Sequence, residues 1–132
     1  MFVTGSFIRF YSNSTFEFLT AGHLPILYYS KSLNTVELLL IKQIPITVKE
    51  DFVFSSRFIN FHKGDVFVLL TDGIVEVMDN KAEMFGLNKV EKILLDNCSG
   101  NAVQIFDLIM NEINKFGKQQ DDQSVIIIKP LS

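Results

Sequence analysis

The sequence predicts an α+β fold in which layers of strands and helices pack on one another. Short apolar runs rich in Phe, Ile, Val and Tyr, separated by turn residues, fill residues 6–70 and are typical of strands. Apolar residues recur at spacings of three and four over residues 87–116, which indicates helices. A last apolar run at 125–129 is strand-like again. Strands that come first and helices grouped after them favour an α+β arrangement.

The strand-like part divides into six segments. The expected strands are residues 6–11, 15–19, 26–29, 36–41, 57–61 and 66–70. Phe16 and Phe18 alternate with polar residues, so one face of their strand should meet solvent. The run 66–70 has no polar residue, which indicates a central strand that is covered on both faces. Turns are expected at 12–14, 31–34 and 62–65, where small, polar or glycine residues gather.

Two helices are expected in the second part of the chain. The first covers residues 87–95, and the second covers 102–116 with an apolar residue at every third or fourth position. Asn101 can cap the second helix, with Gln104 three residues later as in a capping box. Gly117 suits the end of that helix.

Composition excludes several classes of protein. The chain has 132 residues, the size of one domain, and 48% of them are hydrophobic, with 13 Phe, so it is not intrinsically disordered. A net charge of -3 argues against nucleic acid as the main partner. The longest stretch without a charged residue, 18–30, is shorter than the roughly 20 residues of a spanning helix. One cysteine, Cys98, excludes an internal disulfide, and no signal peptide is recognisable, so a cytoplasmic protein is expected.

Three polar features interrupt the apolar background. Asp72 and Gly73 follow the predicted central strand, where a carboxylate could point into a site or simply form a turn. Asp121 and Asp122 precede the last strand, and such a pair is either a solvated loop or a cation ligand. His23 lies in an Ala-Gly-His-Leu-Pro segment, which is more typical of a structural turn than of a catalytic base.

Taken together, Asp72 and Asp121 make a stronger signal, because each lies at the end of an apolar strand and one sheet can bring such ends together. Hard cations such as Mg²⁺ and Mn²⁺ prefer carboxylate oxygens, and a metal pair can activate water for attack on a phosphate. A phospho-acceptor or dehalogenase-like aspartate is a further alternative. It is disfavoured because Leu70 and Ile74 occupy the positions where that chemistry wants a second acid.

Several ordered motifs carry a family resemblance. They are TFEFLTAGHLPILYY, KGDVFVLLTDGIVE, MFGLNKVEKIL and DDQSVIIIK. In this order they resemble the metal-dependent (PPM-type) serine/threonine protein phosphatases, in the bacterial branch that includes sporulation stage II protein E and RsbU. The resemblance covers nearly the whole chain and implies an antiparallel β-sandwich flanked by helices.

The resemblance also implies a function and a site. It implies two Mn²⁺ or Mg²⁺ ions, a metal-bound water that attacks phosphoserine or phosphothreonine, and a phosphorylated regulatory protein as substrate, by analogy an anti-sigma-factor antagonist. Asp72 and Asp121 match metal ligands of the family. Gly73, Asp122 and His23 match residues next to those ligands, and His23 belongs to a structural turn.

The chain also departs from the family pattern. The family's Asp-x-x-Gly-His-Gly motif, which supplies the metal-bridging aspartate, lies upstream of the strand that begins here at Phe2. A glycine of the family is replaced at 44–47, and Ser124 stands where threonine is usual. Residues 1–132 are therefore expected to be the C-terminal part of a single phosphatase domain, incomplete at its N-terminus, with little activity alone. The alternative is a non-catalytic interaction module that binds a partner or itself.

The apolar composition gives a last expectation. If the covering elements of the sandwich are absent, strand edges and apolar faces should be exposed, and such surfaces promote association. The segments 6–11 and 66–70 are expected to be open edges, so a homodimer formed by edge or apolar-face pairing is predicted.

Overall fold

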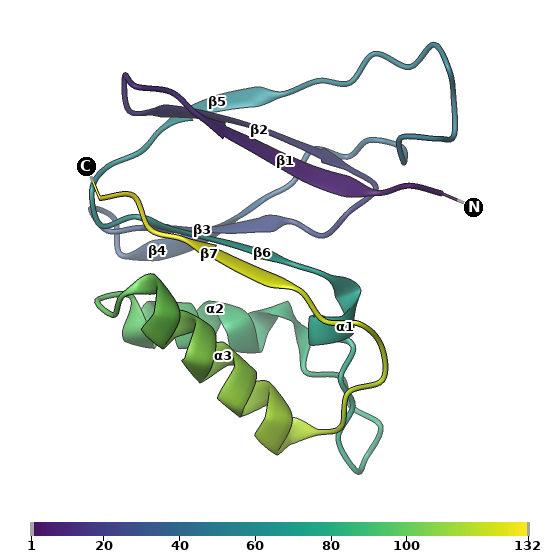
Figure 1. Cartoon of the computed structure of the whole chain (residues 1–132), viewed down its shortest axis with the longest axis vertical. Helices are drawn as coiled ribbons and strands as arrows, with labels where there is room; N and C mark the ends of the chain where they lie inside the picture. Colours follow the sequence, from purple (N-terminus) through teal and green to yellow (C-terminus); the bar gives the residue numbers. More distant parts are fainter. Residues whose placement is uncertain (1, 132) are drawn as a thin grey trace.

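The computed structural model describes residues 2–131 and arranges them in three layers, which Figure 1 shows from one side. One sheet has the strand order β1-β2-β5 and the other has the order β4-β3-β6-β7. The strands are β1 (Gly5–Phe10), β2 (Thr15–Ala21), β3 (Ile26–Ser30), β4 (Thr35–Leu39), β5 (Arg57–Asn60), β6 (Val66–Leu70) and β7 (Val125–Ile128). The helices are α1 (Asp72–Val75), α2 (Gly86–Asn97) and α3 (Ala102–Phe116).

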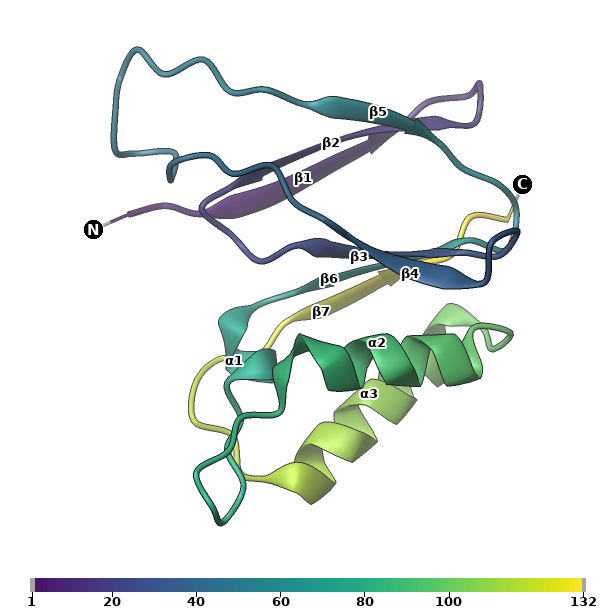
Figure 2. The same ribbon diagram turned by 180° about the vertical axis from the view of Figure 1, so that it is seen from behind.

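The two sheets stack face to face, and α2 and α3 cover the outer face of the four-stranded sheet (Figures 1 and 2). All strand pairs are antiparallel, so the α+β fold that the patterns predict and the β-sandwich that the family resemblance implies are both confirmed. The bounds of the expected strands and long helices differ from those observed by no more than two residues. Within residues 2–131, none of the helices combines the length and the apolarity that crossing a bilayer requires.

The strand β6 explains the run of apolar residues at 66–70. Val66, Val68 and Leu70 belong to the core under the helices, whereas Phe67 belongs to the core between the two sheets. Because β6 pairs with β3 on one side and β7 on the other, it is central, as its sequence predicts. The expectation that 66–70 is an open edge is therefore wrong. By contrast, β1 does lie at the edge of its sheet.

The segment that follows β6 also differs from the expected turn. Residues 72–75 form the short helix α1, which is closed by the backbone N–H of Glu76 donating to the carbonyl of Asp72 at 2.9 Å. Ile74 and Val75 are buried in the core under the helices, which holds this single turn of helix in place. A segment of four residues is too short to show a helical period, so the sequence pattern alone does not reveal α1.

Aromatic rings fill the space between the sheets. Phe16 and Phe67 meet edge to face with ring centroids 4.7 Å apart, and Tyr28 stacks on Phe67 at 4.8 Å. Other aromatic residues remain outside this core, since Phe7 and Phe58 on the three-stranded sheet are 54% and 62% exposed. They alternate along their strands with Ile8 and Ile59, which pack inward. The outer face of this sheet is therefore partly apolar, whereas pairing with a second copy stays a prediction.

Candidate functional site

The pairing of β6 with β7 brings the two acidic segments of the sequence together. Leu70, the last residue of β6, lies opposite Val125, the first residue of β7. Beyond this pair, the backbone N–H of Thr71 donates to the carbonyl of Ser124 at 3.1 Å. The backbone N–H of Ser124 in turn donates to the hydroxyl of Thr71 at 2.9 Å. The chain that leaves β6 and the chain that enters β7 therefore meet at one end of the four-stranded sheet.

Gly73 makes the closest approach between these segments. A Cβ atom at this position would overlap the backbone carbonyl of Asp122, whose carbon would lie 2.8 Å away. The side chain of Gln123 also donates to the carbonyl of Gly73 at 3.1 Å. Because backbone rather than a flexible side chain occupies this space, even alanine at 73 would force the segments apart. The glycine thus places Asp72 next to the Asp121–Asp122 pair.

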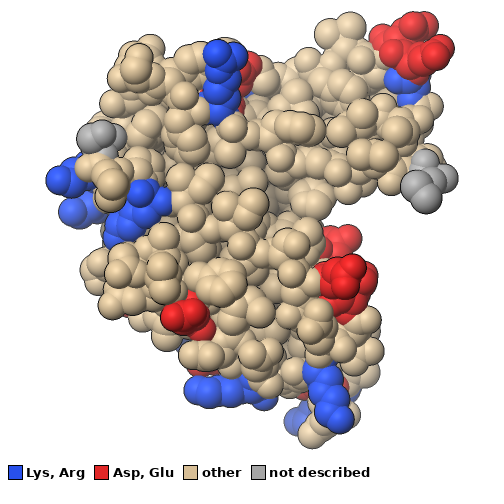
Figure 3. Space-filling model, in the orientation of Figure 1, with Lys and Arg blue, Asp and Glu red and all other residues tan. Residues whose placement is uncertain are grey.

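The carboxylates at this end are open to solvent. Asp72, Asp121 and Asp122 are all exposed, and one oxygen of Asp121 accepts the backbone N–H of Asp122 at 2.7 Å. Figure 3 shows acidic side chains gathered on the side of the molecule where α1 lies. Like charges on neighbouring segments repel one another, and a cation bound nearby lowers that cost. The exposure of these carboxylates leaves their oxygens open to a cation from solvent.

His23 contacts the same end of β6, and both of its ring nitrogens form hydrogen bonds within the protein. Its Nε2 lies 3.1 Å from the carbonyl oxygen of Leu70, which can only accept, so Nε2 carries the proton. Its Nδ1 is hydrogen-bonded to the hydroxyl group of Thr4 at 3.2 Å. The preceding Gly22 has a φ of 61°, a conformation that favours glycine. The ring ties this turn to the strand that leads into Asp72, which is a positioning contact.

Asp65 is the polar residue that the sequence reasoning missed. It is 0% exposed and lies at the start of β6, at the far end of the strand from Asp72. Its carboxylate accepts from the hydroxyl of Tyr28 at 2.6 Å and from the backbone N–H groups of Lys31 and His62 at 2.9 and 2.8 Å. Burial, and secondly this bond to Asp65, raise the pKa of Tyr28 above its usual value. The sequence feature that could have pointed to Asp65 is an acidic residue directly before a wholly apolar strand.

The donor atoms fit part of a site for a divalent cation. Among the side chains of residues 2–131, no three His, Cys, Asp or Glu lie together in a group that could hold a metal ion. Asp72 and Asp121 nevertheless offer exposed carboxylate oxygens on adjacent segments. Mg²⁺ is commonly bound through one or two carboxylates and keeps several waters, and Mn²⁺ accepts the same ligands. The remaining ligands would be water, or groups outside these residues.

Comparison with known proteins identifies the family of the chain. The sequence model of the Stage II sporulation protein E (SpoIIE) family matches residues 1–130. The chain belongs to the SpoIIE family. The phosphoserine phosphatase RsbU of Bacillus subtilis (strain 168) is 26% identical over 136 residues, which cover 98% of this chain and 39% of RsbU. The family is thus one of PPM-type phosphatase domains, as the motifs suggest.

Solved structures of phosphatase domains share the fold. The phosphatase domain of SpoIIE from Bacillus subtilis, presoaked with Mn, superposes with a TM-score of 0.73 at 17% identity, covering 96% of this chain and 56% of that domain. The SiaA-PP2C domain of Pseudomonas aeruginosa gives 0.73 at 16% identity, covering 88% of this chain and 46% of that structure. The chain therefore spans about half the length of these structures and a smaller share of RsbU.

Proposed function

We propose that this chain is part of a metal-dependent serine/threonine protein phosphatase in which Asp72 and Asp121 hold a divalent cation. The observation that carries the proposal is the approach of the Asp122 backbone to Gly73, which joins the two acidic segments at one sheet end. Membership of the SpoIIE family and the likeness to a phosphoserine phosphatase support it. The presoaking of a SpoIIE structure with Mn supports Mn²⁺ or Mg²⁺ as the ion, and two ions are expected in the complete domain.

The residues of the proposed site have two roles: some bind the cation, and others position the residues that bind it. Asp72 and Asp121 are the proposed ligands, and Asp122 adds negative charge beside them. Gly73 and His23 are positioning residues, because the first admits the neighbouring backbone and the second bonds to Leu70 at the end of β6. When bound, a divalent cation lowers the pKa of water and offsets charge on a transferring phosphate.

The charge at this end bears on how a substrate would be recognised. Three exposed carboxylates repel a phosphate dianion, so a bound cation would favour the approach of a phosphorylated side chain to Asp72. We infer that the substrate is a phosphoserine or phosphothreonine on a regulatory protein, by family analogy an anti-sigma-factor antagonist. Such a partner would meet the protein in the cytoplasm.

The test is Mn²⁺-dependent hydrolysis of a phosphoserine peptide by the complete phosphatase domain that contains this chain. Asp72→Asn should lower the rate by about 100-fold or more, since loss of a ligand costs at least as much as loss of the groups that support it. The matched control is Asp107→Asn, which neutralises an exposed carboxylate on α3. Equal activity of Asp72→Asn and the control would exclude the proposed role.

The chain of 132 residues is a separate case, for which we expect little or no hydrolysis on its own. Robust Mn²⁺-dependent activity of this chain, abolished by Asp72→Asn, would contradict that expectation. If the complete domain neither binds Mn²⁺ nor hydrolyses the peptide but still binds a regulatory protein, the alternative of a non-catalytic interaction module holds instead.

A further inference from the structure

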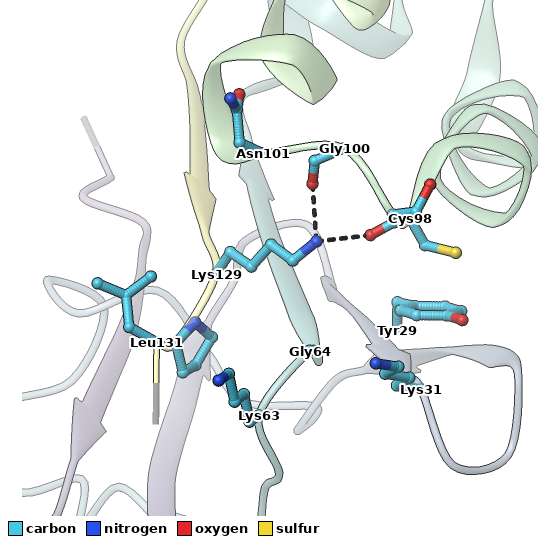
Figure 4. Close-up of a pocket in the computed structure, with 11 residues that line it drawn as sticks. Tyr29, Lys31, Lys63, Gly64, Cys98, Gly100, Asn101, Lys129 and Leu131 are labelled. Carbon is cyan, nitrogen blue, oxygen red and sulfur yellow. Dashed lines mark hydrogen bonds between the residues drawn. The ribbon is translucent and has the colours of Figure 1, made fainter.

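A cavity of about 490 Å³ lies at the other end of the four-stranded sheet from Asp72 and Asp121. Its walls come from the end of β3, the start of β6, the end of β7 and the loop between α2 and α3. Figure 4 shows three lysines around this opening: Lys31, Lys63 and Lys129. None of the residues that line the cavity is acidic. Nothing in the proposed phosphatase chemistry uses this space.

The lysines of the cavity are not explained by pairing with carboxylates. The chain as a whole carries a net charge of -3, yet three of its 12 basic residues meet here. The ion pair found within residues 2–131 is Lys115–Glu112, on the surface of α3. The nearby Asp65 is buried, and its carboxylate already accepts three hydrogen bonds. The positive charge of these three lysines is therefore available to a ligand.

Lys129 is held in place and keeps a free donor. Its ammonium group donates to the carbonyls of Cys98 and Gly100 at 2.8 and 2.7 Å, which fixes it at the end of α2. An ammonium group has three donors, so one remains for a ligand. Asn101, which follows Gly100, caps α3. The N-terminal end of α3 adds a partial positive charge on the same side.

The side chain of Lys31 also has a defined place beside the cavity. Gly64 has a φ of 94°, and a Cβ atom there would collide with the aliphatic stem of Lys31. The glycine therefore leaves the room in which this stem lies. The backbone N–H of Lys31 is fixed by Asp65 at 2.9 Å, so the side chain starts from a rigid point. The ammonium group of Lys129 is thus held by hydrogen bonds, and the aliphatic stem of Lys31 has a defined place over Gly64.

We propose that this cavity binds a small organic molecule that carries phosphate. Phosphate offers several strong acceptor oxygens, which suit several ammonium donors that line one cavity, and its negative charge offsets their positive charge. The apolar lining by Pro130, Leu131 and the ring of Tyr29 suits an organic moiety. The volume lies within the roughly 300–1,000 Å³ of small-molecule pockets. The site is independent of the proposed metal site.

The experiment is a calorimetric titration of the 132-residue chain with ADP, inorganic pyrophosphate and adenosine, in EDTA so that no metal contributes. ADP should bind saturably, pyrophosphate more weakly, and adenosine without saturation. Changing Lys31→Gln and Lys63→Gln together should weaken ADP binding by about tenfold or more, because the loss of even one charged hydrogen bond costs about that much. Lys129 is left intact because it also secures α2.

Matched controls separate this site from general charge effects. Lys42→Gln removes an exposed lysine from the loop after β4 and should leave ADP binding unchanged, as should Asp72→Asn. Circular dichroism confirms that each variant is folded. The proposal is overturned if neither ADP nor pyrophosphate binds saturably at millimolar concentration, or if the double variant binds ADP as the wild type does. Binding of a phosphoserine peptide without binding of ADP would also overturn it.

Discussion

The buried bond between Tyr28 and Asp65 gives a prediction whose size follows from the structure. Tyr28→Phe removes the hydroxyl that donates to Asp65 at 2.6 Å and leaves the ring stacked on Phe67. Asp65 is 0% exposed, so water cannot replace the lost donor, although two backbone N–H groups still hold the carboxylate. A bond to a charged acceptor is worth about 1.5–3 kcal/mol, so the free energy of unfolding should fall by about 2 kcal/mol.

The assay is urea unfolding at pH 7 with Tyr29→Phe as the matched control. The hydroxyl of Tyr29 donates to the neutral side chain of Asn34 at 3.1 Å, so its loss should cost only about 0.5–1 kcal/mol. The two variants remove the same atom from adjacent residues of β3. If Tyr28→Phe costs no more than Tyr29→Phe, the account of Asp65 as a buried carboxylate that needs its donors is refuted.

The same pair predicts a dependence on pH. Burial and the bond to Asp65 raise the pKa of Tyr28 in the folded protein above its unfolded value of 10.0. The contribution of Tyr28 to stability is therefore fully present below about pH 10 and is lost as the pH rises from there through the folded pKa. Urea unfolding between pH 8 and 11 should show a smaller alkaline loss in Tyr28→Phe than in the wild type.

Three further predictions concern other elements. Gly73→Ala should lower the free energy of unfolding by about 2 kcal/mol or more and weaken Mn²⁺ binding, because backbone must move; unchanged thermal unfolding would contradict this. Asn101→Ala should cost about 1 kcal/mol in urea unfolding through loss of the capping box, and no change would mean that the cap is not needed. Hydrogen bonds from Ser56 and Tyr11 lower the pKa of Glu17, so their contribution is present above pH 4.5 and is lost as the pH falls through the lowered pKa. Glu17→Gln should remove this acid-dependent part of the stability, and an unchanged acid unfolding profile would exclude it.

Local patterns predict most of the fold, whereas long-range pairing decides the site. Alternation and helical spacing over many residues give the bounds of the strands and of α2 and α3, and the capping box at Asn101 is confirmed. The short helix α1 has too few residues for any period. The pairing of Leu70 with Val125 joins segments more than 50 residues apart, so the sequence alone could not show that the segments of Asp72 and Asp121 lie at the same end of one sheet. The burial of Asp65 depends on contacts from β3, which no neighbouring residue reveals.

The error about β6 has a similar origin. A run that is apolar on both faces tells that a strand is covered, but not which segments supply its partners. Here β3 and β7, from distant parts of the same chain, occupy both edges of β6. The strand could therefore be recognised as central, while its neighbours had to come from the structure.

The central claim is that Asp72 and Asp121 hold a divalent cation at the end of β6. Its most direct test is paramagnetic line broadening in the NMR spectrum of the ¹⁵N-labelled chain during titration with Mn²⁺, which also detects weak binding. We expect the amide signals of residues 71–74 and 121–124 to broaden first, and we expect Asp72→Asn to abolish this selectivity while Asp107→Asn does not. Broadening that starts elsewhere, or that is the same in wild type and Asp72→Asn, would contradict the account.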